Sequence, residues 1–354
     1  MEKKVSYFIL YLLMLVFLFY SIYFPNKYIL MNSVFVIYSF FFGLRYDVGI
    51  DYKAYFKIYN SDYRDLEKGY EVLQTLAKNF NSFYLLIFLT FFLSMLFIQL
   101  TFLEKESKIQ FIVWFYFVFL ISGLIFGYLN VIRQALASSI AYFSIYSLRK
   151  KRKVIGLLSM LLGTYFHKSL ILVAPIYLLI KYIRITKLQA ILSVLVFYIL
   201  TISGLINKII YFLFKITEFN YKSYNINTLD EIMQRTNSTI GLGVIIKIII
   251  FIIIIKYLND EEKIMGYYEK LYMIGIIFSI IGLKNFVLGR VGIYFDLFSV
   301  YLIADFFSKY TKKYMFFKVL IFLLLSLTYF KIIIKPVEEE KIKYKSIFFI
   351  KSEN

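Results

Sequence analysis

The sequence predicts an all-α protein that crosses a membrane many times, and three observations support this. Hydrophobic residues occupy 61% of the 354 positions, well above the roughly 45 to 50% of an ordinary soluble domain. Most of them lie in runs of about 20 residues, the length of helix that spans the hydrocarbon layer of a bilayer. The 41 Lys and Arg residues exceed the 22 Asp and Glu residues, as expected where cytoplasmic loops carry positive charge.

The apolar runs place about 11 to 12 transmembrane helices along the chain. The expected spans are residues 5–24, 28–44, 82–103, 109–129, 131–148, 154–166 with 169–180, 188–206, 241–258, 267–283, 293–308 and 314–334. The sequence has 3 prolines and no Gly/Ser-rich linker, so we expect a single integral membrane domain over residues 1–354. No small-residue cleavage site follows the first run, which predicts a retained helix rather than a removed signal.

Composition also narrows the chemistry and the partners. A strongly basic soluble chain can bind nucleic acid, but the positive-inside bias and anionic lipid head groups account for the charge here. We therefore expect no nucleic-acid partner. The chain has no Cys, which excludes disulfides and thiolate chemistry, and its single His, His167, argues against a His-based metal site. We expect neither a metal nor a cofactor.

Charge patterning predicts the orientation of the helices. Five consecutive cations at residues 149–153 stand between two apolar runs and belong on the cytoplasmic side. Counting spans from there places two loops outside the cytoplasm, residues 45–81 and residues 207–240. The six basic and six acidic residues of the first loop cancel, which agrees with this side. Lys3 and Lys4 would favour the cytoplasm and conflict with the N-out start that the count gives.

The loop at residues 45–81 carries the densest set of candidate functional residues. Two carboxylates, Asp47 and Asp51, lie close to Arg45 in sequence, and either could orient an acceptor hydroxyl or act as a base. Gly49, between the two carboxylates, indicates a backbone constraint. Further along the loop come aromatic and acidic side chains, which suit the binding of a ligand with flat or cyclic parts. These are Tyr52, Glu67 and Tyr70. The alternative is an ordinary solvated loop between two helices.

The break at His167 is the second candidate place. Two segments of about 13 residues each span roughly 20 Å, less than the hydrocarbon layer, so the turn between them is expected in a protein-lined, water-accessible pocket. It holds His167 and Lys168. An imidazole titrates near neutral pH and is a natural general base. The alternative is a polar cap on a helix end near the interface.

Two helix starts on the outer side complete the candidate set. The first carries Arg133 and Gln134 before a stretch of small residues that lets helices approach closely. The second carries Arg290 and Tyr294. A guanidinium binds phosphate through two parallel hydrogen bonds, which favours an anionic ligand. Snorkelling of Arg133 to the interface is the competing interpretation.

These motifs occur in an order that resembles one family. The motifs are R-x-D-x-G-x-D-Y from Arg45 to Tyr52, E-x-G-Y from Glu67 to Tyr70, N-x-x-R-Q from Asn130 to Gln134, F-H-K-S-L from Phe166 to Leu170 and G-R-x-x-x-Y-F from Gly289 to Phe295. Together they resemble the EpsG family of Wzy-like polysaccharide polymerases. The resemblance implies a GT-C-like membrane glycosyltransferase of capsule, exopolysaccharide or O-antigen synthesis. Its implied substrate is undecaprenyl diphosphate-linked oligosaccharide at the outer face of the cytoplasmic membrane, with a flippase and a chain-length regulator as partners.

Glycosyl transfer from a lipid diphosphate gives the candidates distinct roles. A base must take the proton of the acceptor hydroxyl, and cations must stabilise the departing diphosphate. Asp47, Asp51 and His167 compete for the role of base. We expect the cations Arg45, Arg133 and Arg290 to bind the diphosphate, so that no metal is required. Two other classes remain open, a flippase for lipid-linked oligosaccharide and a membrane O-acyltransferase.

Overall fold

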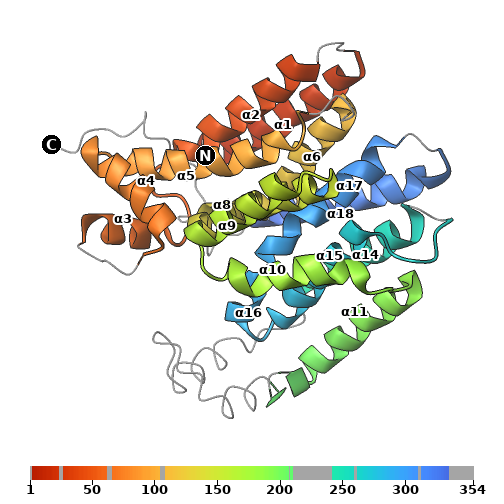
Figure 1. Ribbon diagram of the computed structural model, residues 1–354. Coiled ribbons are helices and arrows are strands. Elements are labelled where there is room, and N and C mark those ends of the chain that lie inside the picture. Colours follow the sequence, from red (N-terminus) through yellow and green to blue (C-terminus); the bar gives the residue numbers. More distant parts are fainter. Residues whose placement is uncertain are drawn as a thin grey trace. The chain divides into compact units, whose positions relative to one another are not determined.

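The computed structural model describes residues 2–23, 27–61, 66–103, 108–206, 208–209, 241–258, 261–309 and 312–334. Every regular element among these residues is a helix (Figure 1). An isolated β-bridge joins Thr186 and Ile264. The predicted all-α fold class is confirmed. The predicted loop at 207–240 lies outside the described residues, apart from 208 and 209.

The chain forms two compact units. Unit 1 comprises Met1–Pro175 and Ile303–Asn354, and unit 2 comprises Ile176–Leu302. Helix α10 (Leu170–Leu179) runs from unit 1 into unit 2, and α17 (Ile293–Ser308) runs back. The expected single membrane domain over residues 1–354 stays a prediction.

Unit 1 is built around two buried helices. Its helices are α1 (Glu2–Tyr23), α2 (Lys27–Gly43), α3 (Tyr52–Asn60), α4 (Lys68–Asn79), α5 (Phe83–Leu100), α6 (Ile109–Ile121), α7 (Leu124–Asn130), α8 (Ile132–Arg149), α9 (Lys153–Phe166), η2 (Lys312–Tyr314) and α18 (Met315–Ile334). Helix α6 is apolar all round, as a fully buried helix must be, and it packs against α1, α2 and α18. Helix α8 packs between α5 and α9.

Small residues explain how α8 and α9 come so close. On α8 the buried positions include Ala137 and Ser138. On α9, a Cβ added at Gly163 would lie 3.4 Å from the Ala137 carbonyl oxygen and 2.5 Å from the Leu170 side chain. Close backbone approach through small residues is the usual packing of helices in membranes. The start of α8, where Arg133 lies, is therefore held firmly against its neighbours.

Unit 2 centres on α15. Its helices are η1 (Ile180–Tyr182), α11 (Lys187–Ile202), α14 (Leu242–Tyr257), α15 (Tyr267–Ile281) and α16 (Phe286–Val291). Helix α15 packs against α11, α14 and α16. Its Lys270 donates hydrogen bonds to the carbonyls of Ile180 and Ile183 at 3.0 and 2.9 Å, and so satisfies backbone groups where η1 ends.

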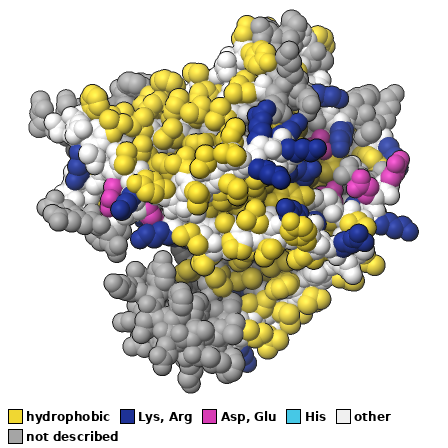
Figure 2. Space-filling view, viewed as in Figure 1, with side chains coloured by type: hydrophobic (Ala, Val, Ile, Leu, Met, Phe, Trp, Pro, Cys, Tyr) yellow, Lys and Arg dark blue, Asp and Glu magenta, His cyan; other side chains and the backbone are white. Residues whose placement is uncertain are grey.

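The exposed helix faces are largely apolar, as a lipid-facing surface requires (Figure 2). Exposed apolar side chains on three helices include Phe8, Leu12 and Phe19 on α1, Leu158 and Leu161 on α9, and Leu192 and Ile199 on α11. Two described helices, Phe83–Leu100 and Met315–Ile333, are each long and apolar enough to cross a membrane. Several shorter helices are also apolar. The count of 11 to 12 crossings stays a prediction.

Two expectations about continuity are decided by the structure. The expected span at 109–129 is not one straight helix, because α6 and α7 meet at 65°. Gly123 lies between them at φ 77°, a conformation that side-chain-bearing residues rarely adopt. The expected break around His167 is present, since α9 ends at Phe166 and α10 begins at Leu170.

Candidate active site

The segment 45–81 is not simply a loop, because it folds into two short helices, α3 and α4, beside the start of α5 (Figure 1). Both helices are amphipathic and bury one face, and the buried face of α3 is a stripe of tyrosines. The buried side chains of α3 are Tyr52, Tyr55 and Tyr59, and those of α4 include Tyr70 and Leu73. The polar segment is therefore a packed part of unit 1 rather than a solvated connection.

Arg45 is the largest fully buried side chain of the described residues, at 1% exposed. Its Nε, Nη1 and Nη2 atoms donate to the carbonyls of Val48, Phe42 and Leu129 at 3.1, 3.0 and 3.0 Å. Burial lowers the pKa of Arg45 to about 10, so the group stays charged at neutral pH. In this structure the guanidinium binds the chain itself, whereas the sequence suggested that it binds a diphosphate.

The turn after Arg45 is docked on the junction of α7 and α8. The Ile50 N–H donates to Asn130 Oδ1 at 2.7 Å. Gly49 has φ 108°, and a Cβ there would lie 2.9 Å from the Leu129 carbonyl oxygen. Only glycine meets both conditions. The first and third sequence motifs are thus joined at the start of the helix that carries Arg133.

Asp47 and Asp51 lie on this turn and are both half-buried. Asp47 adopts φ 50°, and its carboxylate is 3.9 Å from Nζ of the exposed Lys53, a contact that contributes little stability. Asp51 directly precedes α3, and its side chain does not cap that helix. Both carboxylates are accessible enough to meet a substrate.

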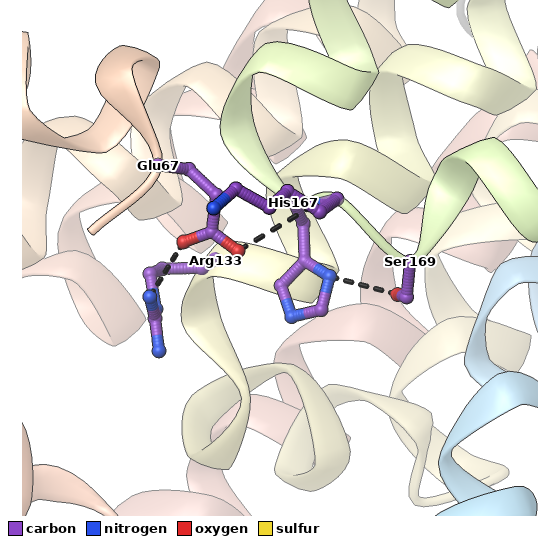
Figure 3. Close-up of polar contacts among 5 residues, drawn as sticks. Glu67, Arg133, His167 and Ser169 are labelled. Atoms are coloured by element: carbon purple, nitrogen blue, oxygen red, sulfur yellow. Dashed lines mark hydrogen bonds and ion pairs between the residues drawn. The ribbon is translucent and has the colours of Figure 1, made fainter. Parts of the chain in front are cut away.

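Glu67 connects two segments that lie far from it in sequence (Figure 3). Its Oε2 accepts from Arg133 Nη1 at 2.6 Å, and its Oε1 accepts from the Lys168 backbone N–H at 3.5 Å. The side chains of Arg133 and Glu67 are 24% and 12% exposed. A charge-assisted bond of this length in a partly buried place is stronger than a surface ion pair.

Aromatic rings surround the other side of Arg133. Its guanidinium carbon lies 5.5 Å from the centroid of Tyr70 and 6.0 Å from that of Tyr55, within cation–π range. Burial raises the pKa of Tyr70, as it does that of Tyr52, so both hydroxyls stay protonated. Both rings are buried, at 1% and 5% exposed. Neither Tyr70, which lies beside Arg133, nor Tyr52 therefore presents an open stacking surface.

Gly69 explains the glycine of the second motif. A Cβ there would lie 2.8 Å from the Tyr165 ring and 2.9 Å from the Tyr165 carbonyl oxygen. Helix α4 can therefore reach the end of α9 only with glycine at this position. The contact brings Glu67 and Tyr70 to the turn that follows α9.

The turn itself presents His167, Lys168 and Ser169. His167 is half-buried and Lys168 is exposed. Ser169 Oγ lies 2.8 Å from His167 Nδ1 (Figure 3). Ser169 was not among the candidates from sequence. Two features of the sequence could have indicated Ser169. It lies two residues after the single His, and it directly precedes a helix, a position where Ser is favoured.

Other predicted residues lie in tighter surroundings. Gln134 is 5% exposed on the buried side of α8. In unit 2, Arg290 is half-buried on α16, and Tyr294 is fully buried with its carbonyl accepting from the Tyr177 hydroxyl at 2.5 Å. A Cβ at Gly289 would lie 2.7 Å from the Gly282 Cα, so glycine lets α16 fold back against α15. That Arg290 binds the same diphosphate as Arg45 and Arg133 stays a prediction.

The described residues do not bring three or more His, Cys, Asp or Glu side chains together in a way that could hold a metal ion. What they bring together is one carboxylate, one guanidinium, one imidazole and one hydroxyl, around the turn after α9. Such a set can move a proton and can hydrogen-bond sugar hydroxyls or phosphate oxygens.

Comparison with known proteins adds one finding. No curated protein and no solved structure matches the chain. A model of the EpsG family matches residues 28–346, a range that contains all five sequence motifs. The match extends over nearly the whole chain and over both units. The chain therefore belongs to the EpsG family.

Proposed function

We propose that the protein is a Wzy-like polysaccharide polymerase. It joins oligosaccharide repeat units carried on undecaprenyl diphosphate at the outer face of the cytoplasmic membrane and releases the lipid diphosphate. Family membership supports the general class. The neutral balance of residues 45–81, against the cations at 149–153, supports the outer side for the site. A flippase that delivers the substrate and a chain-length regulator are the proposed partners.

One observation carries the proposal, the double contact of Glu67 with Arg133 and with the backbone of Lys168. It brings the second, third and fourth motifs to one place. The first motif is joined to them through Asn130, three residues before Arg133. Residues that lie up to 101 positions apart thus meet in one polar site of a largely apolar protein. Polar groups at such a place are characteristic of function in membrane proteins.

The proposed step is one displacement at the anomeric carbon. The acceptor hydroxyl oxygen forms the new bond to that carbon while its proton passes to His167. The bond from the anomeric carbon to the phosphate oxygen breaks, and its electron pair leaves with the lipid diphosphate. His167 is half-buried and lies in the turn that Glu67 holds, which favours it as the base over Asp47 and Asp51. These two carboxylates would orient the acceptor.

Cations must stabilise the leaving diphosphate. Arg133 already donates through Nη1 to Glu67, so its charge is partly balanced, and the 24% of its side chain that is exposed can meet the ligand. Lys168 is exposed in the turn whose backbone meets Glu67, and its ammonium group adds a second cation. We assign the diphosphate to these two residues. Arg45 instead positions the first motif, because its three nitrogens bind backbone carbonyls.

The test is the profile of lipid-linked oligosaccharides in cells that lack the protein. A polymerase predicts that single repeat units accumulate on the outer leaflet while long polymer disappears. Accumulation on the inner leaflet would instead identify a flippase. Polymer of normal length that has lost acyl groups would identify an O-acyltransferase. Complementation with wild-type protein and with a His167→Ala variant of equal membrane abundance ties the result to the site.

A further inference from the structure

Outside its buried face, α4 carries two rows of side chains with different character. The apolar row consists of Val72, Leu76 and Phe80, which directly follows the helix, and these are 61%, 43% and 68% exposed. The polar row consists of Glu71, Thr75 and Lys78. Successive residues turn by about 100° around a helix axis, so the two rows lie on different flanks of α4. Large apolar side chains aligned in this way differ from the singly scattered ones of an ordinary surface.

The two ends of α4 lie at the ends of two apolar helices. Near its start, Gly69 packs against Tyr165, the second-last residue of α9, where a Cβ would come within 2.9 Å of the Tyr165 carbonyl oxygen. At its other end, Phe80 lies three residues before Phe83, the first residue of α5. Three residues reach about 11 Å at most, and α5 is long and apolar enough to cross a membrane. Helix α4 therefore extends along the ends of these helices.

Tyrosines indicate the level of these two helix ends. Tyr165 near the end of α9 is 47% exposed, and Tyr84 at the start of α5 is half-buried. Tyr is enriched where a helix passes from the hydrocarbon into the head-group region. An element that links two such ends lies at the head-group level, where one flank can meet acyl chains while another meets water.

The surroundings of the apolar row favour lipid as its occupant. Leu161 and Tyr165 lie four residues apart on α9 and are 65% and 47% exposed, so the exposed apolar surface of α9 runs up to the start of α4. Lys68 and Lys78, near the two ends of α4, are exposed. Basic side chains beside an apolar row are the pattern by which surface helices bind anionic lipid.

We propose that α4 is an interfacial helix. Its apolar row enters the leaflet on the side of residues 45–81, and its polar row faces water. Helix α4 begins directly after Glu67, so its depth in the leaflet sets the depth of the bond between Glu67 and Arg133. That this level is the level of a lipid-linked diphosphate rests on the proposed function, whereas the lipid contact of α4 does not.

Site-directed spin labelling tests the lipid contact directly, because the chain has no native Cys. Val72→Cys, Leu76→Cys and the matched control Thr75→Cys each carry one nitroxide in full-length protein, in liposomes that contain phosphatidylglycerol. Oxygen concentrates in the hydrocarbon and a neutral nickel chelate in water, so their effects on relaxation report the depth of each label. We expect oxygen to dominate at Val72 and Leu76 and the nickel chelate to dominate at Thr75. A water-like response at all three positions would overturn the proposal.

The same labels reveal the other possible occupants. A second copy of the chain would shield the labels at Val72 and Leu76 from both reagents and couple them magnetically to the labels of its neighbour, until unlabelled protein dilutes them. Another segment of this chain would shield them without such coupling. Either result would overturn the lipid contact. Phe80→Cys, the third position of the row, must give the same answer in protein whose unfolding midpoint equals that of wild type.

A charge substitution tests the consequence for the site. Leu76→Glu places a carboxylate in the apolar row, and Thr75→Glu places the same group one residue away in the polar row. We expect Leu76→Glu to shift a label at Val72 toward the nickel chelate and to reduce polymer per unit of membrane-inserted protein several-fold, while Thr75→Glu changes neither.

Normal polymer from a Leu76→Glu protein whose label has moved into water would overturn the link between the depth of α4 and the site. If deletion of the protein leaves polymer unchanged, the proposed function fails. The labelling experiment needs no activity and still decides whether α4 contacts lipid.

Discussion

The bond between Glu67 and Arg133 gives the sharpest prediction of the structure. Glu67→Ala leaves Arg133 with an unbalanced charge in a partly buried place and frees the backbone N–H of Lys168. Loss of a partner from a fully buried pair destabilises by about 3 to 5 kcal/mol, and loss of an exposed pair by about 0 to 1 kcal/mol. With side chains 24% and 12% exposed, we expect about 2 kcal/mol, which includes a discount for solvent screening.

The measurement is a double-mutant cycle on purified protein in lipid nanodiscs. The four proteins are wild type, Glu67→Ala, Arg133→Ala and the double variant, and the readout is the shift in thermal or denaturant unfolding midpoint. The double variant should be about as stable as the worse single variant, which gives a coupling of about 2 kcal/mol. The pair Asp305–Lys309 in unit 1 is the matched control. It is also short, at 2.8 Å, but lies within one helix turn and is more exposed, so Asp305→Ala should change stability by only about 0.3 to 0.5 kcal/mol.

Glu67→Gln separates position from charge. The amide keeps the shape of the side chain and one oxygen acceptor, but it cannot balance Arg133. We expect a modest loss of stability and at least about a tenfold loss of polymer, equivalent to 1.4 kcal/mol. A coupling no larger than that of the control pair, together with normal polymer from Glu67→Ala, would refute the role of Glu67 as the link between the motifs.

Four further outcomes follow from the structure. A cysteine at Ser61 should react with an impermeant thiol reagent in intact cells while one at Lys151 should not, and no native Cys interferes; reversed labelling would place the site in the cytoplasm. Asp51→Asn removes the charge of the half-buried Asp51 side chain but keeps its size and polarity, so polymer should disappear at normal protein level, and wild-type chain lengths would remove Asp51 from the mechanism. Arg45→Lys keeps the charge but cannot make all three carbonyl contacts in the guanidinium geometry, so we expect a loss of about 2 to 3 kcal/mol in unfolding free energy; a stability equal to wild type would return Arg45 to the list of ligand-binding candidates. Gly69→Ala should cost about 1 to 3 kcal/mol because its Cβ meets backbone, and unchanged unfolding would show that α4 can move away from α9.

Several residues predicted from the sequence to form a site lie close together in the structure, and the structure also shows which contacts each of them makes. His167, Arg133 and Glu67 were all candidates, and the structure places them around one turn. Arg45 has the same predicted role as Arg133, because the sequence does not show whether an arginine side chain is buried or exposed. The structure separates the two, since one binds three carbonyls and the other binds a carboxylate.

The sequence alone determined the class of the protein and the position of its main break. Apolar runs in such number leave only helices as a stable form in lipid, because a helix satisfies its own backbone hydrogen bonds. A segment too short to span predicted the turn at His167, and the motif order indicated the family. These are local properties, or properties of composition, and they can be read along the chain.

Only the tertiary structure decided which polar groups meet. Glu67 lies 66 residues from Arg133 and 101 from Lys168 in sequence, and their contact depends on how closely α4 approaches α9 and on the way α8 begins. Both close approaches need a glycine, because a Cβ at Gly69 or Gly163 would lie too close to neighbouring atoms. A glycine in a sequence does not say what will pack against it. The partner is fixed by close packing of distant segments, which no local pattern records.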